Sequence, residues 1–227
     1  MSNEDISRLV LQPRKRYSGV RMQQGRVMLD SDWNENEAID NEDKRRTLME
    51  IVCSKGTPNQ GFAVENPVRK EVTPPTSDPV QSYDFALQDG SFYLGGLRHE
   101  IETDDPPETF LRQTDWLQID ADAGNLPTPP TSLPGNGVRH DLVYLRGWEQ
   151  SVSAVEDSEL RERALGGPDT SVRRRRMRRI EVLTDVPETC AAAFARLHEE
   201  LAGPLSPDTS ATHHFDDVSC ELKSRAR

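Results

Sequence analysis

The alternation of apolar and polar residues predicts a strand–turn–helix element near the N-terminus. Residues Tyr17–Met22 and Arg26–Leu29 each read as a short strand, because Val20 and Met22 alternate with polar neighbours, as do Val27 and Leu29. Gly25 marks a turn or bulge between them. We expect this strand pair, with Val27 and Leu29, to be buried in the subunit.

The next segment, from Asp30 to Val52, predicts the longest helix of the chain. Asp32 and Glu35 have the spacing of a capping box. Acidic residues fill its first half and basic residues follow at positions 44–46, an order that complements the helix dipole. The apolar face is thin, and a helix that is polar nearly all round usually bridges to another body or pairs with copies of itself.

The rest of the chain predicts a mostly antiparallel β body with two short helices, so the expected class is α+β and β-rich. Asp89-Gly90 predicts a hairpin turn between Tyr83–Leu87 and Ser91–Ile101. Further strands are predicted at Trp116–Ile119, Leu142–Trp148 and Val172–Leu183, and helices at Glu156–Leu165 and Pro187–Leu201. The predicted organisation is a flexible arm (1–14), an attachment element (15–56), a linker or long loop with one short strand at Phe62–Val64 (57–81) and a β-rich domain (82–227).

Composition narrows the function classes. The net charge of −11 argues against nonspecific binding of nucleic acid or anionic lipid through the whole surface. No run of about eighteen apolar residues and no secretory signal are visible, so we expect synthesis in the cytoplasm. The three cysteines are far apart and odd in number, which does not suggest a disulfide scaffold.

Two clusters could carry chemistry. His213, His214, Asp216, Asp217 and Cys220 have metal-ligand chemistry, but their spacing fits no standard zinc pattern and a polar loop is the favoured interpretation. The second cluster is the basic strand Arg173, Arg174, Arg175, Arg176, Arg178 and Arg179. It could bind phosphate, but no aromatic residue interleaves with the arginines, so a solvated or interface-facing strand is favoured over a nucleic-acid site.

Other chemistry finds little support in the sequence. The acidic block Asp30–Asp43 lacks the central glycine of a calcium loop. No phosphate loop, nucleophile elbow, zinc-protease motif or plausible catalytic cysteine is present, so we expect no enzyme activity and no cofactor. Trp33, Trp116, Trp148 and Tyr93 could stack on sugars, although tryptophans in a β-rich domain more often belong to the core.

Three segments carry a family resemblance. They are YSGVRMQQGRVMLDSDWNENEAID, FYLGGLRHEIE with ETFLRQTDWL, and LVYLRGWEQSVSAVEDSELRERALGGPDTSVRRRRMRRIEVL, which together span about residues 15–183. In this order they resemble an uncharacterised bacterial family found with phage-tail-like contractile injection systems. One departure is the arginine run, where the family pattern has fewer bases and an aromatic residue. Residues 25–34 also resemble the opening of trimeric stalks in phage tail fibres and baseplate proteins.

The resemblance implies a structural component of a contractile injection particle that acts by protein–protein assembly. Its expected partners are baseplate, spike, fibre or cap proteins and further copies of itself, in a particle that stays in the cell or is released. The expected docking and oligomer-forming residues are Arg21, Gln24, Arg26, Asp30, Asp32, Trp33 and Asn34. Two alternatives are kept: a carbohydrate- or receptor-binding module that uses Trp116, Trp148 or Tyr93, and a cell-wall or glycan hydrolase with a carboxylate pair about 5–10 Å apart.

Overall fold

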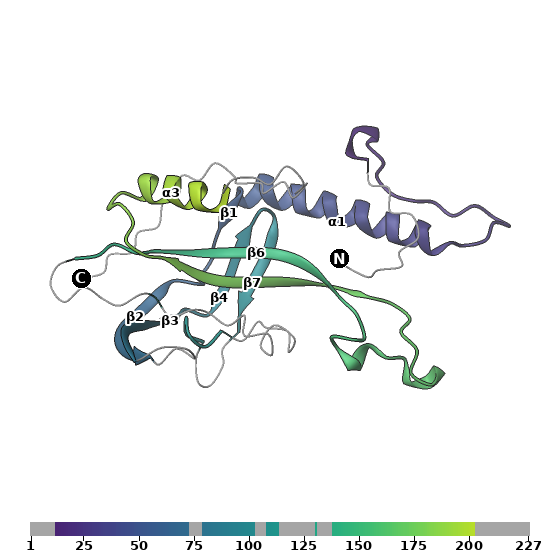
Figure 1. Cartoon of the computed structure of the whole chain (residues 1–227). Helices are drawn as coiled ribbons and strands as arrows, with labels where there is room; N and C mark the ends of the chain where they lie inside the picture. Colours follow the sequence, from purple (N-terminus) through teal and green to yellow (C-terminus); the bar gives the residue numbers. More distant parts are fainter. Residues whose placement is uncertain (1–11, 73–78, 103–107, 114–129, 131–137, 203–227) are drawn as a thin grey trace. The chain divides into compact units, whose positions relative to one another are not determined.

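The protein is described by a computed structural model at residues 12–72, 79–102, 108–113, 130 and 138–202 (Figure 1). Its helices are α1 (Asp30–Val52) and α3 (Cys190–Ala202), and its strands are β1 (Lys55–Gly56), β2 (Val64–Val72), β3 (Val80–Leu87), β4 (Gly90–Leu94), β5 (Leu97–Ile101), β6 (Leu142–Val152) and β7 (Arg173–Leu183). Short 3-10 turns lie at Pro13–Lys15, Ser158–Leu160 and Arg163–Leu165. The strands form three small sheets, ordered β1-β4-β5, β2-β3 and β6-β7. The predicted α+β, β-rich class is confirmed.

The chain folds into two compact units, each built from separate stretches of sequence. Unit 1 combines Met1–Thr57 with Phe92–Arg98 and Glu149–Arg175. Unit 2 combines Pro58–Ser91 with His99–Trp148 and Arg176–Arg227. The predicted organisation divides the chain into consecutive segments. Within the described residues, no helix is both long and apolar enough to cross a membrane.

The predicted hairpin around Asp89-Gly90 is wrong. Strand β3 pairs with β2, whereas β4 pairs with β1 and β5. The reason is that residues 59–63 are hydrogen-bonded to the backbone on either side of Asp89. Phe62 N–H donates to Gln88 O at 2.8 Å, and Ser91 N–H donates to the Asn59 side chain at 3.2 Å. The two-residue turn lies at Gly95-Gly96, whose φ angles of +57° and +78° suit a left-handed hairpin turn.

The predicted linker of residues 57–81 is also wrong over much of its length. It contains β2 and the start of β3, which pair antiparallel with Val64 opposite Leu87 and Lys70 opposite Ser82. The register shifts between Glu65 and Val68, where Asn66 has a φ of +46° and Pro67 offers no N–H. A Pro- and Thr-rich composition therefore concealed a bulged strand.

The core of unit 2 joins residues far apart in the sequence. One cluster contains Phe85, Leu87, Ile101, Phe110 and Ile180, with the Phe85 and Phe110 rings stacked at 5.2 Å between centroids. In a second cluster, α3 packs Ala193 and Leu197 against Leu142 and Val186. The apolar period of α3 matches its burial, which is why the predicted helix Pro187–Leu201 is found, with a later start at Cys190.

The remaining predicted elements have mixed outcomes. Strand β7 covers the predicted Val172–Leu183 closely, and β6 extends the predicted Leu142–Trp148 to Val152. The predicted helix Glu156–Leu165 is wrong, because this segment forms two separate 3-10 turns. Asp157 and Glu162 cap them by accepting from the N–H groups of Glu159 and Ala164. The predicted strand Trp116–Ile119 lies outside the described residues.

Candidate assembly surface

The segment before α1 is a loop rather than the predicted strand pair. Residues 17–22 and 26–29 belong to no sheet, and the turn between them is closed by Arg26 N–H donating to Gln23 O at 3.3 Å. We call residues 14–29 the basic loop, because they contain five basic residues and no acidic residue. In Figure 1 the loop (purple) projects from the end of the chain's first helix, α1.

A long-range hydrogen bond links the basic loop to α1. Val20 N–H donates to Asn36 Oδ1 at 2.9 Å, and the neighbouring Gly19 has a φ of +156°. At the far end of the loop, Gly25 has a φ of +73° and open space around the position of a Cβ atom. The backbone conformation at Gly25 thus favours glycine, and no described atom would crowd a Cβ atom there.

The apolar side chains of this region face solvent. The expected burial of Val27 and Leu29 is wrong, since Val27 is 82% exposed and Leu29 is 50% exposed. The structure has twelve large hydrophobic residues classed as exposed among its described residues. Six of them lie between positions 17 and 33: Tyr17, Met22, Val27, Met28, Leu29 and Trp33. Such a concentration of exposed apolar surface marks an interaction site more often than chance.

Helix α1 confirms the predicted long polar helix but not its predicted cap. The helix begins at Asp30, with Leu29 at the N-cap and no side-chain cap hydrogen bond. Asp32 and Glu35 therefore lie inside the helix and do not form a capping box. Of its 23 residues only Ser31 and Ile39 are buried. We call residues 30–43 the acidic half, because they contain seven acidic residues and no basic residue.

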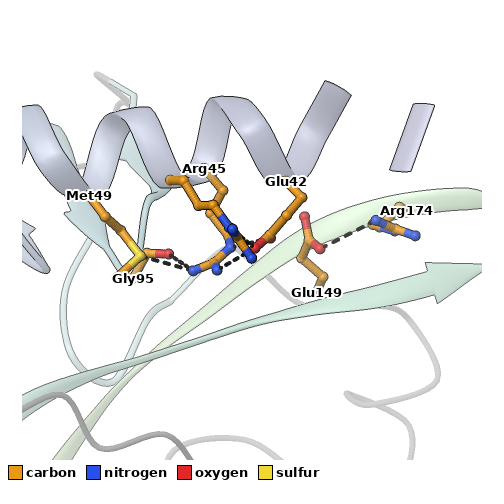
Figure 2. Close-up of polar contacts among 7 residues, drawn as sticks. Glu42, Arg45, Met49, Gly95, Glu149 and Arg174 are labelled. Atoms are coloured by element: carbon orange, nitrogen blue, oxygen red, sulfur yellow. Dashed lines mark hydrogen bonds and ion pairs between the residues drawn. The ribbon is translucent and has the colours of Figure 1, made fainter. Parts of the chain in front are cut away.

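The second half of α1 is fastened to the β4–β5 turn of the same unit (Figure 2). Arg45 binds both oxygens of Glu42 at 2.8 and 3.0 Å, and the same guanidinium donates to Gly95 O at 3.1 Å. Arg46 adds a bond of 2.7 Å to Glu42. The hydrogen bond from Arg45 is the main cause that lowers the pKa of Glu42 to about 2.

The expected docking residues fall into two groups. Arg21, Gln24, Arg26, Asp30 and Trp33 are exposed, whereas Asp32 and Asn34 are partly buried. A shallow, open pocket of about 220 Å³ has its lining entirely within residues 20–32 and includes Arg21, Arg26 and Asp32. Three of the seven expected residues are therefore neighbours around one depression between the basic loop and the start of α1.

The six arginines of β7 do not form a uniform basic strand. Arg173, Arg174, Arg175 and Arg176 are exposed, and Arg174 lies 3.7 Å from Glu149 of the same unit (Figure 2). Arg178 is only 7% exposed and makes two bonds of 2.8 Å to Glu108, which is 1% exposed. The expected interface role is wrong for Arg178, because its charge is used inside unit 2.

Sequence reasoning missed the buried polar groups that hold unit 2 together. The Gln113 side chain pairs with the backbone of Ile180, accepting from its N–H at 2.8 Å and donating to its carbonyl at 2.9 Å. Asp141 binds Arg139, the hydroxyl of Tyr83 and the N–H of Asp185. Burial favours a higher pKa for Asp141, but these hydrogen bonds outweigh it and lower the pKa. No local sequence motif marks any of these partners.

The alternative sites find less support in the described residues. Trp148 is partly buried, with Arg146 and Arg179 placed 5.5 and 5.7 Å from its ring centroid, and Tyr93 is also partly buried. Trp116 and the candidate metal ligands at 213–220 lie outside the described part of the chain. Within that part, no group of three or more His, Cys, Asp or Glu residues is placed to hold a metal.

The fold and this surface define a β-rich α+β protein with an exposed basic and apolar loop ahead of a long polar helix. Residues 2–203 match the model of a family of unknown function (DUF6519), and the chain belongs to that family. No curated protein and no solved structure matches the chain.

Proposed function

We propose that this protein is a structural component of a contractile, phage-tail-like injection particle, and that it acts by protein–protein assembly through the basic loop and the first half of α1. The observation that carries the proposal is the gathering of six exposed large hydrophobic residues in positions 17–33. Exposing these apolar side chains to water is unfavourable. Burying them against a partner lowers the free energy by roughly 25 cal/mol per Å² of apolar surface.

Three further observations agree with an assembly role. The first of the three segments that resemble proteins of contractile injection systems covers this same stretch of sequence. The buried carboxylate of Glu108 and the partly buried one of Asp141 are held by internal arginine partners. The pKa of Asp141 is lowered, whereas a catalytic general acid needs a raised pKa. The described residues therefore favour contacts over catalysis as the basis of function.

Particle incorporation of a single-residue variant tests this proposal. Trp33→Ala removes an aromatic side chain that is 65% exposed, so the variant is expected to stay folded but to be lost from purified particles. Val155→Ala is the matched control, because Val155 is also apolar and is 84% exposed but lies far along the sequence from the basic loop. Normal incorporation of Trp33→Ala, or equal loss with both variants, would overturn the proposal.

A further inference from the structure

Unit 1 has one basic and one acidic surface, and each of them also exposes apolar side chains. The basic loop presents Arg21 and Arg26 beside Met22 and Val27, and all four side chains are exposed. On α1, residues Trp33, Glu37 and Asp40 follow the i, i+4, i+7 spacing of one helix face and are also exposed. One surface is apolar and basic, and the other is apolar and acidic.

Within the described part of one copy, the charged side chains named above are not paired with one another. The side chains of Arg21, Arg26, Glu37 and Asp40 make no hydrogen bond or ion pair with other described residues. Leu29 is extended and is followed directly by the first helical residue, so residues 26–29 lead into the N-terminal end of α1. The other side of the loop contacts α1 where Val20 N–H donates to Asn36 Oδ1.

We infer that the basic loop of one copy binds the acidic face of α1 in a second copy of this chain. This inference rests on the proposed function and names one partner of the same surface. The loop would bring Arg21 and Arg26 to Glu37 and Asp40, while Met22 and Val27 cover Trp33. If the two copies exchange loops reciprocally, the contact forms an isologous dimer, and if the contact runs one way it builds a ring when the rotation closes. Charge pairing would set the partner and the register, and apolar contact would supply most of the affinity.

The experiment is a charge swap in the full-length chain, followed by sedimentation at low and high salt. The loop variant is Arg21→Glu with Arg26→Glu, and the helix variant is Glu37→Lys with Asp40→Lys. We expect the wild type to self-associate, more strongly at low salt, because the pairs are exposed and screened. Each variant alone should lose self-association by at least about tenfold. An equimolar mixture should form hetero-complexes, and the four substitutions combined in one chain should restore self-association.

A matched control is Glu50→Lys, an exposed acid in the other half of α1, which should associate like the wild type. Circular dichroism checks that every variant keeps its helix. A wild type that stays monomeric up to about 100 μM at low salt would overturn the inference. So would a mixture of the two variants that fails to associate.

The two proposals fail separately. If the purified protein is monomeric but Trp33→Ala is still lost from particles, the copy-to-copy contact is wrong and the assembly role stands. If the swap pattern appears but the loop and helix variants both enter particles normally, the assembly role is wrong and the self-association stands.

Discussion

At the scale of single residues, the chain separates charges that hold the fold from charges that remain available on the surface. Arg178 and Arg174 are four positions apart on β7, yet Arg178 is enclosed with Glu108 and Arg174 is more than half exposed beside Glu149. Their energetic roles should differ accordingly. An exposed ion pair contributes about 0–1 kcal/mol, whereas removing one partner of a buried pair costs about 3–5 kcal/mol.

Glu108→Gln should therefore destabilise the protein by about 3–5 kcal/mol, because the Arg178 charge would stay buried without its carboxylate. Arg174→Gln is the control and should cost at most about 1 kcal/mol. Urea unfolding followed by tryptophan fluorescence measures both changes. Equal unfolding midpoints for the two variants would show that Glu108 and Arg178 do not form the enclosed pair.

Residue alternation alone could not distinguish Val27 and Leu29 from core residues. Their spacing is that of a half-buried strand, but burial requires a second strand and a covering layer, and the described part of unit 1 supplies neither at that position. Arg178 is the opposite case, because a residue expected at a surface is buried. It stands in a run of arginines interrupted by Met177, and its charge is balanced by Glu108, which lies 70 positions away in the sequence.

At the scale of secondary-structure elements, a prediction succeeded where the element was long and its apolar residues recurred with a clear period. Helices α1 and α3 and strand β7 are long enough for their patterns to identify them. The pairing of β3 with β4 was wrong because a turn signal does not specify which strands it joins. Asn59 and Ala63 contact the backbone around Gln88, and this long-range contact has no local sequence signature.

The Gly95-Gly96 turn provides a paired test of how closely α1 approaches β4 and β5. A Cβ atom on Gly96 would lie 2.4 Å from Arg45 O, whereas a Cβ atom on Gly95 meets nothing within 4 Å. Both residues have positive φ, so alanine costs about 1–2 kcal/mol at either position. Gly96→Ala should cost about 1–3 kcal/mol more than Gly95→Ala in chemical denaturation, because α1 must also move. Equal costs would mean that the turn does not touch the helix.

The link between Glu42 and Arg45 makes α1 sensitive to acid. The pKa of Glu42 in the folded state is about 2, below its ordinary value of 4.5. Its stabilising contribution is therefore complete above pH 4.5 and is lost as the pH falls from 4.5 toward 2. Glu42→Gln should reduce the loss of stability across this range, measured by circular dichroism at a series of pH values. Glu50→Gln is the exposed control, and an unchanged pH profile for Glu42→Gln would contradict the assignment.

At the scale of the whole molecule, the distribution of charge matters more than its total. The chain has a net charge of −11, yet residues 14–29 carry five bases and residues 30–43 carry seven acids. The sequence shows this division, and the structure adds that Arg21, Arg26, Glu37 and Asp40 are exposed. A binding partner that is basic or acidic throughout would meet repulsion at one of these two surfaces, which favours a partner with the same division.

The whole-molecule charge also leads to a prediction about nucleic acid. Duplex DNA binds through several basic side chains that face phosphates together. In this chain Arg178 is enclosed with Glu108, Arg174 lies near Glu149, and Arg179 lies against the ring of Trp148. We therefore expect no shift of duplex DNA in a gel assay at physiological salt, and Arg173→Gln with Arg175→Gln should leave that result unchanged. Binding tighter than about 1 μM, lost in this double variant, would instead assign the basic strand to nucleic acid.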